Sequence, residues 1–130
     1  MLKVACIPAY NVENMIYDVV TRSKTVVDMV IVCDDGSVDD TIKQASKAGA
    51  VVISHEKNLG KGAALKSLFN YCLKINADIV VTIDGDGQFL PEEIPKLTTS
   101  LIENNSDVVI GYRFEDNEEM PAYRKVGNKF

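Results

Sequence analysis

Two aspartates stand one residue apart directly after an apolar run, a spacing that is typical of a metal site. Residues 84–88 read Asp-Gly-Asp-Gly-Gln, and residues 79–83 before them read Ile-Val-Val-Thr-Ile. A run of this length predicts a buried strand, so Asp84 and Asp86 would reach one spot at its carboxyl end. Their hard oxygen ligands suit Mg²⁺ or Mn²⁺, and Mg²⁺ is usually held by one or two carboxylates plus substrate phosphates. The motif therefore predicts a site for a metal-bound di- or triphosphate.

The same two carboxylates have a simpler interpretation as solvated side chains of a turn. Two of them at a buried strand end would repel each other without a cation, which favours metal binding. A calcium loop of the EF-hand type is excluded, because its sixth position would be Phe89 and its twelfth Pro95. A dehalogenase-type phosphohydrolase, with Asp84 as nucleophile and Asp86 as acid and base, stays a remote alternative. Its motif normally lies on the first strand and has Thr or Val where Gln88 stands.

Polar residues also follow the other predicted strands. Residues 8–11 are Pro-Ala-Tyr-Asn, residues 34–37 are Asp-Asp-Gly-Ser, and Arg113 follows a fifth apolar run. Residues 58–62, Asn-Leu-Gly-Lys-Gly, precede a predicted helix and would turn their backbone or Lys61 toward a phosphate. Each segment also fits an ordinary turn, helix cap or loop. The chain has no GxGxxG sequence after its first strand and no Walker A loop, because a glycine follows the lysine where Ser or Thr is required.

Apolar strand-like runs alternate with amphipathic helical patterns, which predicts an α/β fold. Such alternation favours a mostly parallel sheet covered by helices on both faces. In the common strand order 3-2-1-4, the loops after strands one, two and four would line one crevice beyond the carboxyl ends of the strands. Ser37 is expected to cap the second helix and Gly49 to end it. The predicted strands are residues 2–7, 29–33, 50–54, 78–83 and 107–110, and the predicted helices are residues 13–28, 38–48, 62–76 and 91–101.

Size and charge limit the kinds of protein this chain can be. Its 130 residues suit one domain, and a net charge of -5 argues against general nucleic-acid binding, which needs a basic surface. None of the three cysteines forms a CxxC pair, so we expect buried free thiols and a reducing, cytoplasmic setting. No signal peptide opens the chain, and no apolar stretch approaches the length of a membrane span. The single histidine, His55, follows the third predicted strand and is not expected to contact a ligand.

The character of the sequence changes after residue 112. Residues 113–130 are polar, show no clear periodicity and carry no element that would close the domain. We therefore divide the chain into a domain of residues 1–112 and a polar segment of residues 113–130. The chain looks cut off, as though further residues follow Phe130.

Taken together, these motifs make the chain resemble the N-terminal half of a family 2 glycosyltransferase of the Rossmann-like GT-A fold. It is most similar to the branch of dolichyl-phosphate mannose synthases and polyprenyl-phosphate glycosyltransferases. Each motif is weak or moderate alone, but five in the right order at the right strand ends are specific. The matching segments are residues 8–11, 34–37, 58–65, 84–88 and 111–113.

The resemblance implies a nucleotide-sugar donor site and a divalent metal. By match, Pro8 and Tyr10 would line the pocket for base and ribose, and Asp35 would hydrogen-bond the base. The family's acidic residue often stands where this chain has Val12, and Glu13, one position further along, is its counterpart in the expected site. The metal ligands would be Asp84, Asp86 and Gln88, with Gly85 between them and Arg113 near the diphosphate or sugar.

The function implied by the resemblance is a metal-dependent, inverting glycosyltransferase. It would move a hexose from a UDP- or GDP-sugar to an acceptor, with a polyprenyl phosphate at a membrane surface as the expected acceptor. Its catalytic base is expected outside this chain, so no residue is assigned to that role. The full-length protein would be cytoplasmic and peripheral to the membrane. The alternative from another class is a nucleotide-sugar-binding fragment that catalyses nothing, and turnover with donor and acceptor separates the two hypotheses.

Overall fold

Four parallel strands form the central sheet of the chain, whose computed structural model describes residues 1–85, 90–103, 108–111 and 123–127. Their order is β3-β2-β1-β4, and every neighbouring pair runs parallel, which confirms the predicted strand order. The loops after β1, β2 and β4 therefore leave the same edge of the sheet. The strands are β1 (Lys3–Ala9), β2 (Met29–Asp34), β3 (Val51–Ser54) and β4 (Ile79–Thr82).

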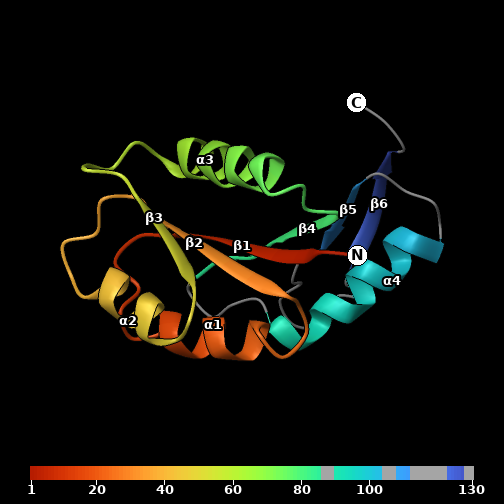
Figure 1. Cartoon of the computed structure of the whole chain (residues 1–130), viewed down its shortest axis with the longest axis horizontal. Helices are drawn as coiled ribbons and strands as arrows, with labels where there is room; N and C mark the ends of the chain where they lie inside the picture. The colour runs from red at the N-terminus through yellow and green to blue at the C-terminus, as the bar shows by residue number, and fades with distance from the viewer. Residues whose placement is uncertain (86–89, 104–107, 112–122, 128–130) are drawn as a thin grey trace, which may run out of the picture.

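Helices cover both faces of this sheet, as predicted (Figure 1). The helix α3 (Lys61–Lys74) lies on one face, and α1 (Ile16–Ser23), α2 (Thr41–Lys47) and α4 (Ile94–Glu103) lie on the other. A short 3₁₀ helix, η1 (Pro91–Glu93), leads into α4, and its proline stands at the position where a fixed φ suits a helix start. In the described part of the chain, no helix is both long and apolar enough to cross a membrane.

Alternating side chains of the strands supply two separate hydrophobic cores. Successive residues of a strand point to opposite faces, so Ile7 joins the core beneath α1 and Cys6 joins the core beneath α3. The three cysteines are buried free thiols, as predicted, and burial raises the pKa of each. The α1-side core also contains Val19, Val20, Val32 and Ile94, and the α3-side core contains Ile31, Cys33, Leu68 and Cys72.

The first helix is shorter than its apolar pattern predicted. It begins at Ile16 and ends at Ser23, because the N–H and the hydroxyl of Thr25 both donate hydrogen bonds to the carbonyl of Arg22 and tighten the chain into turns. The carboxylate of Asp28 then accepts a hydrogen bond from a backbone N–H of β1. This contact with β1 fixes the position at which β2 begins. The helical pattern of apolar residues gave no indication of it.

Ser37 does not cap the second helix, contrary to the sequence prediction. The helix α2 begins at Thr41, and the carboxylate of Asp39 accepts hydrogen bonds from the N–H and the hydroxyl of Thr41. The Ser37 hydroxyl instead accepts a hydrogen bond of 2.8 Å from the N–H of Asn11, which ties the loop after β2 to the loop after β1. Gly49, with a φ of +98°, follows α2 as predicted.

The predicted fifth strand does not join the central sheet. Instead, β5 (Val108–Gly111) pairs antiparallel with β6 (Tyr123–Gly127) in a separate two-stranded sheet. The segment of residues 113–130, for which the sequence showed no clear periodicity, therefore contains a strand. The sequence of β6 is mostly polar and lacks the apolar alternation of a half-buried strand, so its pairing with β5 is what defines it.

Gly36 holds the turn after β2 close to the β3–α3 loop, and a side chain there should destabilise the fold. Its φ is +81°, and an added Cβ would stand 2.5 Å from the carbonyl carbon of Lys57. We expect Gly36→Ala to lower the free energy of unfolding by about 1–3 kcal/mol in urea titrations. The control is Gly62→Ala in α3, where no atom lies within 4 Å of the new Cβ. It should be neutral or stabilising by about 0.5–1 kcal/mol, and equal losses in both variants would contradict this account.

Candidate functional site

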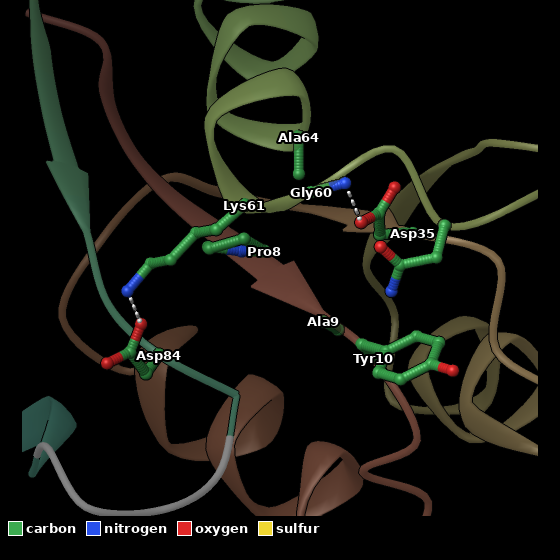
Figure 2. Close-up of a pocket in the computed structure, with 9 residues that line it drawn as sticks. Pro8, Ala9, Tyr10, Asp35, Gly60, Lys61, Ala64 and Asp84 are labelled. Carbon is green, nitrogen blue, oxygen red and sulfur yellow. Dashed lines mark hydrogen bonds and ion pairs between the residues drawn. The ribbon is translucent and has the colours of Figure 1, made fainter.

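A pocket opens at the carboxyl ends of β1, β2 and β4, where the topology brings three loops together (Figure 2). It encloses about 270 Å³, near the lower end of the size range of small-molecule sites. Four residues that the sequence singled out for the donor site line it: Pro8, Tyr10, Asp35 and Asp84. The other lining residues are Ala9, Asn58, Gly60, Lys61 and Ala64.

Asp35 supplies the buried charge of this pocket, with 4% of its surface exposed. Its Oδ1 accepts hydrogen bonds from the N–H of Leu59 at 2.9 Å and from Nδ1 of His55 at 2.8 Å. Its Oδ2 accepts one from the N–H of Gly60 at 2.8 Å. Burial alone would raise the pKa of Asp35, but these bonds favour the charged form and hold the pKa below its usual range. A carboxylate has about four acceptor positions, so one on Oδ2 remains for a ligand donor.

A second carboxylate, Asp84, follows β4 and is paired with Lys61 across the pocket (Figure 2). Nζ of Lys61 lies 2.7 Å from Oδ1 of Asp84, and the two side chains are 63% and 48% exposed. Lys61 is the first residue of α3 and directly follows Gly60, so the segment that binds Asp35 also carries this lysine. An exposed ion pair contributes at most about 1 kcal/mol, so a metal ion or a diphosphate can exchange into it.

The end of β1 separates the two carboxylates. Because β2 and β4 flank β1, and adjacent strands lie about 4.8 Å apart, the strands that lead to Asp35 and Asp84 are roughly 10 Å from each other. Pro8 lies between them in the pocket wall, and Tyr10, which is 47% exposed, presents an aromatic ring. The pocket therefore offers a fixed acceptor at one side, an apolar surface in the middle and an exchangeable ion pair at the other side.

Two of the residues predicted for the donor site lie elsewhere. The carboxylate of Glu13 accepts a hydrogen bond of 2.9 Å from the N–H of Asp40, at the N-terminal end of α2. Gly85 is buried, and an added Cβ would stand 3.3 Å from the side chains of both Ile7 and Ile16. Close packing of the chain after β4 against the core therefore explains the glycine at this position. Three further predicted residues, Asp86, Gln88 and Arg113, lie outside the residues that the structure describes.

The chemistry of the pocket fits a divalent ion that is held together with a phosphate ligand. Within residues 1–85 and the other described ranges, no group of three or more His, Cys, Asp or Glu side chains is placed to hold a metal ion. Asp84 offers a half-exposed carboxylate that already binds the cationic group of Lys61. One or two carboxylates completed by substrate phosphates are the usual protein site for Mg²⁺, so this donor set agrees with the predicted metal.

Sequence reasoning did not find the hydrogen bonds that occupy Asp35. The three donors, on His55, Leu59 and Gly60, lie 20, 24 and 25 positions further along the chain. No local pattern points to such contacts. The one feature of the sequence analysis that could have indicated these contacts is the predicted strand order, because it places the ends of strands two and three side by side.

Asp35 should make the fold sensitive to acid. Its pKa is lower in the folded protein than in the unfolded chain, where it is about 4. Its stabilising contribution is therefore complete above about pH 5 and is lost as the pH falls through the folded-state pKa. Asn has no titrating group, and its amide would bring an N–H against a backbone N–H of Leu59 or Gly60, so one donor would lose its acceptor. Asp35→Asn should therefore lower the free energy of unfolding by about 1–3 kcal/mol at neutral pH.

The same variant should lose less stability than the wild type when the pH is lowered, and urea titrations at neutral and acidic pH measure both effects. Asp18→Asn, which changes a carboxylate that is 60% exposed, is the control and should stay within about 0.5 kcal/mol of the wild type at neutral pH. An identical pH dependence in the wild type and Asp35→Asn would overturn the prediction.

The chain matches known proteins along nearly its whole length. The model of Glycosyl transferase family 2 matches residues 4–129. A UDP-N-acetylglucosamine--dolichyl-phosphate N-acetylglucosaminyltransferase of Methanococcus voltae is 36% identical over 143 residues, which cover 94% of this chain and 57% of that protein. An undecaprenyl-phosphate 4-deoxy-4-formamido-L-arabinose transferase of Pseudomonas savastanoi pv. phaseolicola is 32% identical, over 95% of this chain and 38% of that protein.

The fold has close likenesses among solved structures. Glucosyl-3-phosphoglycerate synthase from Mycobacterium tuberculosis, in complex with Mn²⁺, UDP and glucosyl-3-phosphoglycerate, is 33% identical, with a TM-score of 0.69 over 85% of this chain and 43% of that chain. This likeness and the strand order confirm the expected GT-A architecture. The chain spans about half the length of the first curated relatives that it matches, which it covers to 57%, 52% and 58%. With these matches of sequence and fold, the chain belongs to glycosyl transferase family 2.

Proposed function

We propose that this chain forms the donor site of a metal-dependent, inverting glycosyltransferase that uses a UDP- or GDP-hexose. One observation carries the proposal: a single pocket joins a fixed carboxylate, Asp35, to an exchangeable ion pair, Lys61 with Asp84, across an aromatic and apolar surface. A nucleoside diphosphate has the matching sequence of groups, from a base with N–H donors through a ribose to a charged diphosphate. The two ends of such a ligand would lie over the ends of β2 and β4.

The relatives support this proposal. The Methanococcus relative is described as using a UDP-sugar and dolichyl phosphate, and the mycobacterial synthase was solved with Mn²⁺ and UDP. We propose a polyprenyl phosphate as the acceptor of the whole protein, at a cytoplasmic membrane surface. In this arrangement residues 1–112 form the donor half, residues 113–130 begin the acceptor side, and the catalytic base belongs to the acceptor side.

Four described residues of the pocket would contact the nucleotide of the donor directly. The remaining acceptor position on Asp35 would receive an N–H of the base, and Pro8 with Tyr10 would contact the base and ribose. Lys61 would leave Asp84 and pair with the diphosphate, because the non-bridging oxygens of a diphosphate carry more negative charge than one exposed carboxylate. Glu13 contacts α2 in the free protein, so in the donor site it would act through the loop after β1.

The metal would be held by Asp84, and we propose Asp86 and Gln88 as its further ligands. Bound there, the metal would act as a Lewis acid and stabilise the negative charge that develops on the leaving diphosphate. Arg113 is proposed to lie near the diphosphate or the sugar, where a guanidinium binds phosphate oxygens well.

Donor binding should depend on the metal through Asp84. Calorimetry with UDP and GDP should show binding that is stronger in Mn²⁺ than in EDTA. Asp84→Ala should remove most of the metal-dependent part, a loss of about 10- to 100-fold in affinity. The matched control is Asp18→Ala, because Asp18 is also an exposed carboxylate paired with a basic side chain, on α1. Equal nucleotide affinity in Mn²⁺ and in EDTA would refute the proposal.

Lys61 should affect metal binding and nucleotide binding in opposite directions. Lys61→Met frees Asp84 from a competing ammonium group, so Mn²⁺ alone should bind up to about fivefold more tightly. The same variant loses a charge-assisted contact to the diphosphate, so UDP with Mn²⁺ should bind about tenfold more weakly. Lys66→Met, an exposed lysine of α3 outside the pocket, is the control. If the affinities for Mn²⁺ alone and for UDP with Mn²⁺ changed in the same direction, Lys61 would not exchange Asp84 for the diphosphate as proposed.

A further inference from the structure

The single histidine of the chain joins three elements beside the pocket without lining it. The ring of His55 lies directly after β3, its Nδ1 is 2.8 Å from Oδ1 of Asp35, and its Nε2 is 2.9 Å from Oγ of Ser67 in α3. The side chain of His55 is 12% exposed. Its backbone N–H also donates to the carbonyl of Asp34 at 2.8 Å, which fixes the main chain beneath the ring. The ring is therefore held from β2, β3 and α3 at once.

We propose that His55 is a positioning residue for donor binding, acting through Asp35 and the β3–α3 loop. The proposal rests on the proposed function, since it assigns a role in the same pocket. His55 fixes the carboxylate of Asp35, and Asp35 in turn accepts the N–H groups of Leu59 and Gly60. Lys61 comes next in the chain, so one ring determines the placement of both the acceptor for the base and the cation for the diphosphate.

The hydrogen bonds select one tautomer of the neutral ring. Asp35 is a carboxylate and can only accept, so Nδ1 of His55 carries the proton and donates it. The other nitrogen, Nε2, is then an acceptor, and the hydroxyl of Ser67 is its donor. The thiol of Cys33 lies 3.7 Å from the same nitrogen and is a weaker partner. Ser67 thus orients the ring, and the ring orients Asp35.

The order Asp35–His55–Ser67 resembles that of a serine hydrolase, but its placement is reversed. In a hydrolytic triad the serine faces the substrate and the aspartate lies behind the histidine. Here Asp35 lines the pocket, while His55 and Ser67 do not. Ser67 also lies inside α3, between Lys61 and Lys74. The arrangement therefore supports the pocket wall and does not present a nucleophile to it.

The first test uses the free protein. Because the chain has one histidine, ¹⁵N NMR of the imidazole gives a single set of signals. At mildly alkaline pH we expect a protonated Nδ1 and a bare Nε2, and the opposite tautomer would overturn the proposal. In hydrogen exchange, His55→Leu should speed the amides of Leu59 and Gly60 by roughly tenfold or more, because Asp35 loses its charge-assisted partner. Unchanged exchange at both amides would also overturn it.

The second test uses calorimetry to measure the binding, with Mn²⁺, of whichever of UDP and GDP binds the wild type more tightly. His55→Leu should bind about 10- to 100-fold more weakly. His55→Asn places an amide N–H near the former Nδ1 and should stay within about threefold of the wild type. Ser67→Ala, which leaves the contact with Asp35 intact, should fall between them, and Lys66→Met, at an exposed position of α3 outside the pocket, is the control that should match the wild type.

The results separate this inference from the proposed function. Equal binding by His55→Leu and the wild type, or no rescue by His55→Asn in folded protein, would overturn the role of His55. A wild type that binds neither UDP nor GDP refutes the proposed function instead, and the tautomer and the exchange of Leu59 and Gly60 then decide whether His55 positions the loop. Thermal unfolding of each variant shows that the compared proteins are folded.

Discussion

The buried carboxylate of Asp35 is the constraint on which the pocket depends. A charge that is 4% exposed is stable only when hydrogen bonds replace its hydration, because an unpaired buried carboxylate costs several kcal/mol or more. Its donors come from His55, Leu59 and Gly60, so the β3–α3 loop has to close over the end of β2. Gly36 allows this closure, because only a residue without Cβ fits against Lys57. Lys61 reaches Asp84 as a consequence.

The two carboxylates of the pocket differ in role because they differ in environment. Asp35 accepts hydrogen bonds from three donors of the fold and has a lowered pKa, so it is a fixed acceptor with one position left for a ligand. Asp84 is half-exposed and is paired with the exposed, exchangeable ammonium group of Lys61. A fixed group suits recognition of a base, and an exchangeable group suits a metal ion that arrives with its phosphate ligand. This division agrees with membership of glycosyl transferase family 2.

The sheet makes the pocket possible by keeping its loops on one edge. Parallel strands with helices on both faces are buried on both sides, and here each face has its own core. Because β1 lies between β2 and β4, residues that are some fifty positions apart in the chain, such as Asp35 and Asp84, line one pocket. The helix α3 has two functions, since Leu68 and Cys72 fill the core while Lys61 and Ala64 line the pocket.

By itself, the sequence determined the α/β class, the strand order, the buried cysteines and the edge of the sheet where the pocket lies. These follow from local periodicity and from the short list of ways in which such elements pack. Tertiary structure alone decided that Ser37 contacts Asn11 while Asp39 binds Thr41 at the start of α2, that residues 123–127 pair with β5, and that His55 and the β3–α3 loop bind Asp35. The physical reason is separation along the chain, because each of these contacts depends on strand pairing or on a partner that is distant in sequence. Hydrogen-bond donors and acceptors that meet only after the chain has folded leave no periodic signal in the sequence.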